Sequence, residues 1–143
     1  MAALVVVDTG PLVAALLERD RDHAWTRAQL QGLPAPLATC EAVLSEAFFL
    51  LQRVRGGGER LAALIDRGAV ESRFDFQDER DSVLRLLRKY ANTPMQLGHA
   101  HEAGVCLVRM TELHRDSRIL TLDRDFAAYR RNGRERIPVL APW

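Results

Sequence analysis

The 143-residue sequence predicts an α/β fold, with a parallel sheet of four or five strands flanked by helices on both faces. Two observations support this prediction. Short apolar runs rich in β-branched residues recur along the chain, and amphipathic segments of helical length separate them. The first run, residues 3–7, contains no polar side chain, which is typical of a strand covered on both faces.

The elements are expected in a regular alternation. The first strand ends at Asp8, Thr9 or Asp8 caps the next segment, and Pro11 begins a helix over 11–19. Further helices are expected at 22–30, 40–54, 59–67, 77–90, 103–113 and 126–131, and further strands at 36–39, 70–74, 118–122 and 137–140. The glycines at 56–58 are interpreted as a loop between helices, so residues 1–143 are expected to form a single domain.

Composition narrows the class of protein. The net charge of +1 gives no global field that would attract a polyanion. Cys40 and Cys106 are distant in sequence and lack the spacing of a disulfide framework or a zinc site. Because no apolar run approaches the roughly 18 residues of a membrane span, we expect a cytoplasmic protein that does not associate with a membrane.

Acidic residues follow two of the predicted strands. Asp8 ends the first strand and Asp123 follows the strand over 118–122. In parallel sheets, ligands bind beyond the carboxyl ends of the strands, so both carboxylates are expected at one crevice. Either residue alone is explained by helix capping, which is the commonest role of aspartate at such a turn.

Glu46 is the third candidate acid. It lies in the helical segment TCEAVLSEAFFLLQRV, and its neighbours one turn away are all apolar: Ala42, Val43, Phe49 and Leu50. A carboxylate within an apolar stripe is costly unless it is paired or binds a cation. The alternative is an internal ion pair with an arginine such as Arg53.

Three converging acids would repel one another unless a divalent ion held them. Oxygen ligands favour Mg²⁺ or Mn²⁺, with Asp8, Glu46 and Asp123 as the metal ligands. Asp125 is either a fourth acid or the cap of a following helix, while Thr9 and Thr121 are candidates for supporting roles.

The triplet Asp8-Thr9-Gly10 also occurs in aspartic proteases. Those enzymes pair two such carboxylates across a shared proton in an all-β context. Here the triplet leads into a helix that begins with proline, and the chain has no second copy. We therefore exclude the protease hypothesis.

Three segments together resemble the PIN-domain family, and in particular the VapC-like ribonuclease toxins of type II toxin–antitoxin systems. The segments are VVVDTGPLVAALL, TCEAVLSEAFFLL and ILTLDRDFAAYRRNGR. The resemblance implies a metal-dependent endoribonuclease that cleaves RNA, uses Mg²⁺ or Mn²⁺, forms a homodimer and is neutralised by a cognate antitoxin protein. It implies Asp8, Glu46 and Asp123 as catalytic residues.

The resemblance fails at one position. Members similar to this chain carry an aspartate at the start of the helix expected over 103–113, where this sequence reads PMQLGHAHEAGVCLVRM. Depending on the anchor, Gly104 or His99 takes that place, and Glu102 is the nearest carboxylate. His99 and His101 are either ligands of a softer metal or solvated loop residues. The alternative function is accordingly a weakened or inactive PIN-like module that binds RNA or an antitoxin without cutting.

Arginines near the C-terminus are candidates for RNA binding, with a solvated charged surface as the alternative. They are Arg124, Arg130, Arg131 and Arg134. A receiver-type or phosphoryl-transfer domain would also place a metal near Asp8. That class requires a phosphate cradle or a lysine near a late strand, and the sequence has neither.

Overall fold

The strand Leu4–Val7 (β1) lies in the middle of a five-stranded sheet in the computed structural model, which describes residues 3–91 and 102–143. The sheet order is β3-β2-β1-β4-β7, and each neighbouring pair is parallel. The other strands are β2 (Leu37–Thr39), β3 (Val70–Ser72), β4 (Ser117–Leu120) and β7 (Val139–Leu140). The predicted fold class is confirmed.

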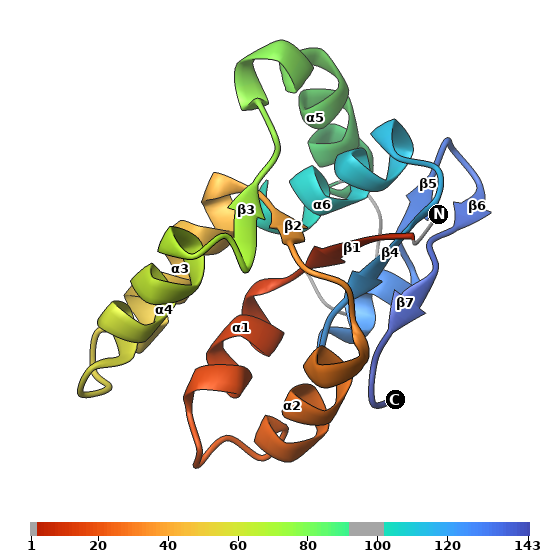
Figure 1. Ribbon diagram of the computed structural model, residues 1–143. Coiled ribbons are helices and arrows are strands. Elements are labelled where there is room, and N and C mark those ends of the chain that lie inside the picture. The colour runs from red at the N-terminus through yellow and green to blue at the C-terminus, as the bar shows by residue number, and fades with distance from the viewer. Residues whose placement is uncertain (1–2, 92–101) are drawn as a thin grey trace.

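Six α-helices connect these strands. They are α1 (Thr9–Leu16), α2 (His23–Gly32), α3 (Glu41–Leu51), α4 (Gly57–Asp66), α5 (Phe76–Ala91) and α6 (Glu102–Leu113). The chain moves outward from β1 to β3, then returns to the other side of β1 at β4. Because parallel crossovers are right-handed, the two directions place their helices on opposite faces. Figure 1 shows α5 and α6 above the sheet and α1 and α2 below it.

The core is built where the central strand meets helices from both faces. Val5, Val6 and Val7 are all buried, as the uninterrupted apolar run of β1 predicts. Helix α6 contacts β1 and β4, and most of its residues are buried. The sheet therefore holds the carboxyl ends of β1 and β4 firmly beside each other.

The segment after β4 differs from the prediction. A helix was expected over 126–131, but the chain forms a short 3-10 helix η1 (Arg124–Ala127) and then a hairpin of β5 (Arg130–Arg131) and β6 (Glu135–Arg136). Asn132 and Gly133 adopt positive φ angles of 51° and 88° in the turn. Asparagine and glycine tolerate this backbone conformation best, so the Asn-Gly pair ends the segment as a hairpin.

The connection between α3 and α4 lies earlier in the chain than expected, over residues 52–56. Only Gly56, with φ of 72°, precedes α4, while Gly57 and Gly58 belong to its first turn. Helix α3 correspondingly ends at Leu51 and not at residue 54.

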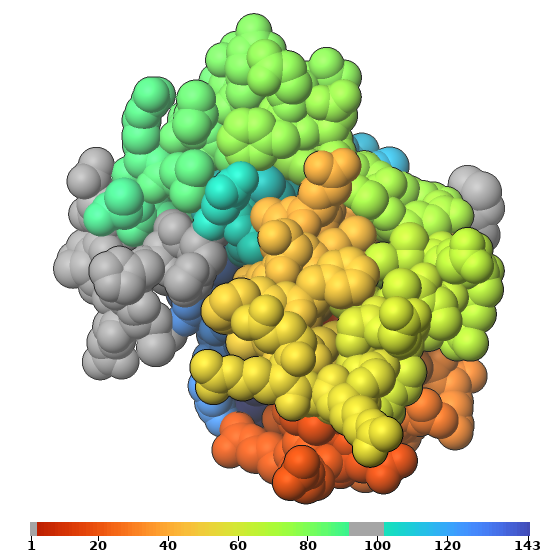
Figure 2. All heavy atoms as spheres, turned by 90° about the vertical axis from the view of Figure 1, so that its left-hand side faces the viewer, coloured from red at the N-terminus to blue at the C-terminus, as the bar shows by residue number. Residues whose placement is uncertain are grey.

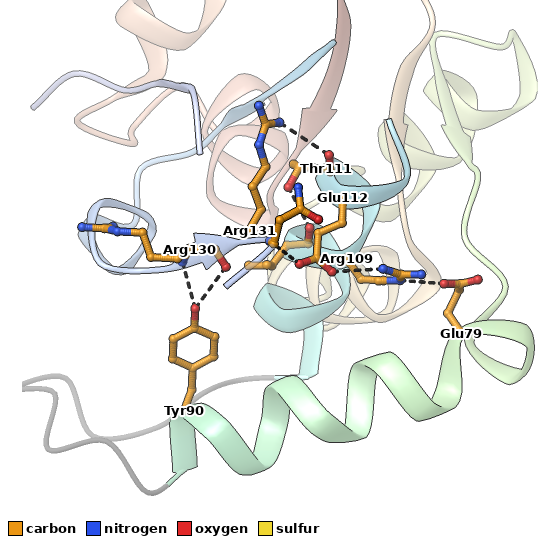
Figure 3. Close-up of polar contacts among 9 residues, drawn as sticks. Glu79, Tyr90, Arg109, Thr111, Glu112, Arg130 and Arg131 are labelled. Atoms are coloured by element: carbon orange, nitrogen blue, oxygen red, sulfur yellow. Dashed lines mark hydrogen bonds and ion pairs between the residues drawn. The ribbon is translucent and has the colours of Figure 1, made fainter. Parts of the chain in front are cut away.

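A polar network joins α5, α6 and the hairpin (Figure 3). The guanidinium of Arg109 donates to Glu79 at 2.6 Å and to Glu112 at 3.1 Å. Glu112 also accepts from the backbone N–H of Asn132 at 2.7 Å. This half-buried ion network fixes α5 against α6 and the hairpin against both.

Candidate functional site

The sheet has a topological switch point between β1 and β4, where the chain reverses its direction of travel. A cavity of about 290 Å³ lies at the carboxyl ends of these two strands. Its lining combines β-strand ends with parts of α1, α3, α6 and η1: Asp8, Thr9, Gly10, Glu46, Leu50, Ala103, Gly104, Leu122, Asp123, Phe126 and Tyr129. Open α/β sheets bind ligands at this position. We call it the acid cavity.

Asp8 is buried and held by two hydrogen bonds. Its Oδ1 accepts from the backbone N–H of Thr9 at 2.8 Å, and its Oδ2 accepts from the hydroxyl of Thr121 at 2.8 Å. Burial raises the pKa of Asp8 from 3.8 to about 6, and the charges of Asp123 and Glu46 contribute to the increase. The hydrogen bonds act in the opposite direction. Asp8 is therefore a carboxylate at neutral pH, although burial and the neighbouring acids disfavour its charged form.

Glu46 reaches the same cavity from α3. The hydroxyl of Thr9 donates to its Oε2 at 3.2 Å. From the sequence, Glu46 was expected to lie within an apolar stripe, where a carboxylate is costly without a partner or a cation. That expectation was wrong. Glu46 is exposed because Phe49 and Leu50, the neighbours one turn ahead, are themselves exposed at 65% and 48%. A carboxylate at the mouth of a cavity needs no buried partner.

Asp123 completes the set from the end of β4. Its backbone N–H donates to the hydroxyl of Thr121, and its Oδ1 accepts from the backbone N–H of Asp125 at 2.9 Å. The Thr121 hydroxyl thus connects Asp8 with Asp123. Asp123 itself is exposed, so its carboxylate is open to solvent at the rim.

The three acids have no ion-pair partner in the part of the chain that the structure describes. No ion pair within residues 3–91 and 102–143 involves Asp8, Glu46 or Asp123. In the same residues, no three histidine, cysteine or acidic side chains are grouped closely enough to enclose a metal ion by themselves. The cavity gathers negative charge without a complete protein ligand set.

The other predicted acids lie beside the cavity. Asp125 is buried in η1, and Glu102 is exposed at the start of α6, where it faces a neighbouring groove. Gly104 lines the cavity and brings no carboxylate. His99 and His101 lie outside the described residues.

A large groove adjoins the acid cavity, with a volume of about 1250 Å³. Figure 2 shows the face where α3 (orange to yellow), the β3–α5 connection (green) and the start of α6 (teal) meet. Glu46 lines both the groove and the cavity, while Phe49, Phe74 and Phe76 give the groove aromatic surfaces. Sequence reasoning missed this groove, because it depends on how α3, α5 and α6 are packed.

The two cysteines are also brought together. Cys40 precedes α3, Cys106 lies on α6, and both are buried free thiols at the groove floor. They are close enough for each thiol to influence the pKa of the other. Sequence distance alone gave no indication of this contact.

The C-terminal arginines occupy different environments. Arg124 is exposed and its guanidinium lies 5.7 Å from the ring centroid of Trp143, and Arg134 is exposed on the hairpin. Arg131 is 5% exposed, and it donates to Glu135 at 3.1 Å and to the carbonyl of Thr111. Arg130 donates to the carbonyls of Ala127 and Tyr129. Figure 3 shows Arg130 and Arg131 on the hairpin beside α6.

Tyr129 is a site residue that sequence reasoning did not identify. It is 3% exposed and lines the acid cavity. Burial raises the pKa of its phenol, and the charges of Asp125, Asp123 and Asp8 add to this effect. Its position six residues after Asp123 was an available signal, but the helix expected there would have directed it elsewhere.

A parallel sheet of this order, with acids at the ends of β1 and β4, is the arrangement that the resemblance to the PIN-domain family implies. The PIN domain family model matches residues 5–132, and the chain belongs to this family. Among curated proteins, none matches this chain in sequence. The solved structures include a similar fold in Mycobacterium tuberculosis VapC20, described as a sarcin–ricin loop cleaving toxin. The TM-score is 0.70 at 17% identity, over 87% of this chain and 93% of that one.

No helix in the described part of the chain combines the length and apolar character needed to cross a membrane.

Proposed function

We propose that this protein is a metal-dependent endoribonuclease that acts as the toxin of a toxin–antitoxin pair. The observation that carries the proposal is the acid cavity. Asp8, Glu46 and Asp123 come from segments far apart in the chain, yet they line one cavity and have no ion pair with the described residues. Membership of the PIN domain family and the fold shared with VapC20 support the same assignment.

The donor set of the cavity fits Mg²⁺ or Mn²⁺. Both ions prefer oxygen ligands, and Mg²⁺ retains several waters while one or two carboxylates hold it, so a closed set of three protein ligands is not required. Burial, with a smaller contribution from the charges of Asp123 and Glu46, raises the pKa of Asp8, and a bound cation would favour its carboxylate form. Asp8 and Asp123 would hold the ion, with Glu46 at the mouth of the cavity.

The chain's own groups position these ligands. Thr121 and the N–H of Thr9 fix the two oxygens of Asp8, and the Thr9 hydroxyl directs Glu46 toward the cavity. When bound, the metal would supply a hydroxide nucleophile at neutral pH and neutralise charge on the scissile phosphate. Glu46 is exposed and accepts only one hydrogen bond from the described residues, so it can take a proton from the attacking water.

The groove is the proposed path of the RNA. Phe76 is 38% exposed and offers a surface on which an unpaired base could stack. Arg124 and Arg134 are exposed and can contact phosphates. Arg130 and Arg131 instead donate hydrogen bonds to groups of the protein itself. An RNA substrate would be met in the cytoplasm.

A cognate antitoxin and a second copy of the chain are the proposed protein partners. Helix α3 exposes three consecutive large apolar side chains, Phe48, Phe49 and Leu50. Exposed apolar side chains of this size are enriched at protein interfaces. An antitoxin bound there would cover the groove beside Glu46.

A non-cutting module that binds RNA or an antitoxin remains the second candidate. Gly104 is the observation in its favour, because it lines the acid cavity where the family resemblance implies an aspartate. Losing one metal carboxylate reduces metal affinity or activity substantially.

The decisive experiment compares purified wild-type protein with Asp8→Asn on a sarcin–ricin loop oligonucleotide and on an unstructured RNA. We expect cleavage by the wild type in Mn²⁺ or Mg²⁺, none in EDTA, and a loss of roughly 100-fold or more in Asp8→Asn. Asp66→Asn, an exposed acid on α4, is the matched control and should cleave like the wild type. Equal cleavage by wild type and Asp8→Asn would disprove the assignment. RNA binding in EDTA without cleavage in Mn²⁺ would establish the non-cutting module.

A further inference from the structure

The hydroxyl of Tyr129 lies at the wall of the acid cavity and makes no hydrogen bond with the described part of the protein. The residue is 3% exposed and lines the cavity together with Asp8 and Asp123. None of the hydrogen bonds among residues 3–91 and 102–143 uses this hydroxyl. A phenol that opens onto a cavity can donate one hydrogen bond and accept another, so this group is available to a water or ligand oxygen that enters the cavity.

The aromatic ring that carries the hydroxyl is held firmly. The ring centroid of Tyr129 lies 4.8 Å from that of Tyr90 and 5.2 Å from that of Phe126, and both pairs meet edge to face. This is the favoured geometry of aromatic pairs. The phenol is therefore directed into the cavity by packing and does not depend on a hydrogen bond for its orientation.

Gly104 leaves the hydroxyl open to the cavity. A Cβ atom at this position would lie 3.6 Å from the Tyr129 hydroxyl and 3.8 Å from the ring of Phe126. Any longer side chain at residue 104 would occupy the space in front of the phenol. Gly104 and Tyr129 thus form one wall of the acid cavity, and the missing side chain of the glycine leaves the phenol accessible.

We propose that Tyr129 is a positioning residue of the site, whose neutral hydroxyl binds the water or phosphate oxygen that Asp8 and Asp123 face across the cavity. The inference rests on the proposed function for the identity of that ligand. A phenol supplies a hydrogen bond without adding a fourth negative charge to acids that already repel one another. It would compensate in part for the carboxylate that position 104 lacks.

The test measures Mn²⁺ affinity by calorimetry and RNA cleavage for the wild type and Tyr129→Phe. Removing only the oxygen should weaken Mn²⁺ binding or lower kcat by about 10-fold or more, as removal of outer ligands does at metal sites. The matched control is Tyr90→Phe, which removes a phenol from the same aromatic cluster. Its hydroxyl bonds the backbone of Arg130 and not the cavity, so Mn²⁺ affinity and kcat should stay within twofold of the wild type.

Gly104→Asp provides a second and independent test. The new carboxylate would face the phenol, so Mn²⁺ should bind about 10-fold or more tightly, and the effect of Tyr129→Phe should largely disappear in the Gly104→Asp background. Thermal unfolding in EDTA shows whether each variant is folded. If Tyr129→Phe does not fold, Gly104→Asp alone decides, and unchanged Mn²⁺ affinity in that variant overturns the inference.

The outcomes separate this inference from the proposed function. A wild type that cleaves no RNA but binds Mn²⁺ through Tyr129 would remove the proposed activity and retain the inference. If the wild type and Tyr129→Phe cleave RNA at equal rates and bind Mn²⁺ with equal affinity, the proposed activity is retained and the inference is overturned. Equal losses in Tyr129→Phe and Tyr90→Phe would also overturn it, since they would indicate a general effect of the aromatic cluster.

Discussion

Asp8 combines burial with two other acids nearby, and its charge therefore opposes folding. At neutral pH the folded protein keeps a carboxylate whose pKa is about 6, against 3.8 for an ordinary aspartate. A difference of about 2 pKa units corresponds to about 3 kcal/mol. In the proposed function, the same carboxylate is a ligand of the metal ion. Function and stability make opposite demands on this residue.

We predict that Asp8→Asn stabilises the protein in EDTA at pH 7 by about 2 kcal/mol. The substitution removes the charge penalty of about 3 kcal/mol and loses roughly 1 kcal/mol from the hydrogen bond with Thr121. Because the folded pKa is raised, the folded wild type binds the extra proton between pH 3.8 and about 6. The wild type therefore loses stability relative to the variant as the pH rises through this window, and the variant's advantage vanishes near pH 4.

Urea unfolding of both proteins from pH 4 to pH 8 measures this effect. A stability difference that does not change with pH would contradict the raised pKa of Asp8. Asp66→Asn again serves as the control, because its carboxylate is exposed and should give the same small difference at every pH.

The positions of Asp8 and Asp123 were predictable because each follows a strand whose apolar pattern is plain in the sequence. The role of Tyr129 was not, because it depends on a turn three residues further on. Asn132 and Gly133 impose a hairpin, and the segment before them becomes a strand and not the expected helix. The Asn-Gly pair itself indicates a hairpin turn. It was overlooked because residues 126–131 were predicted to be helical.

The α3–α4 connection is a place where two elements approach closely. A Cβ atom on Gly57 would lie 2.8 Å from the carbonyl oxygen of Leu51 and 3.1 Å from the Cβ of Val54. The neighbouring glycine, Gly58, has room, since its Cβ would meet only Phe48 at 4.0 Å. The run of three glycines was interpreted as a loop because sequence alone does not distinguish a glycine needed for packing from one needed for a turn.

Gly57→Ala and Gly58→Ala are therefore expected to have opposite effects. Gly57→Ala should lower the free energy of unfolding by about 1–3 kcal/mol, since backbone must move to admit the methyl group. Gly58→Ala should leave it unchanged or raise it by about 0.5–1 kcal/mol, because alanine favours a helix. Urea denaturation of the pair checks this prediction, and equal effects would mean that α4 does not approach α3 as described.

On the surface of the described part of the molecule, three of the exposed large apolar side chains lie on α3, next to the groove. A dimer formed through Phe48, Phe49 and Leu50 would bury that surface and bring two acid cavities near each other. We predict that the wild type sediments as a dimer and that Phe49→Glu sediments as a monomer, because a buried charge without a partner would oppose association.

Leu113→Glu is the matched control for this experiment. Leu113 lies at the end of α6 and is 45% exposed, so the same change is made on another part of the surface. This variant should remain dimeric in sedimentation velocity. A wild type that stays monomeric at all concentrations, or a Leu113→Glu variant that dissociates equally, would contradict an interface at α3.

The central place of β1 has a consequence for the order of events during synthesis. The first strand made has β2 on one side, but its other neighbour, β4, begins at Ser117. Asp8 and Glu46 leave the ribosome long before Thr121 and Asp123, which close the cavity over a sequence separation of 113 residues. A growing chain thus carries Asp8 and Glu46 apart from their counterparts, and the centre is assembled only after residues 117–123 have been made.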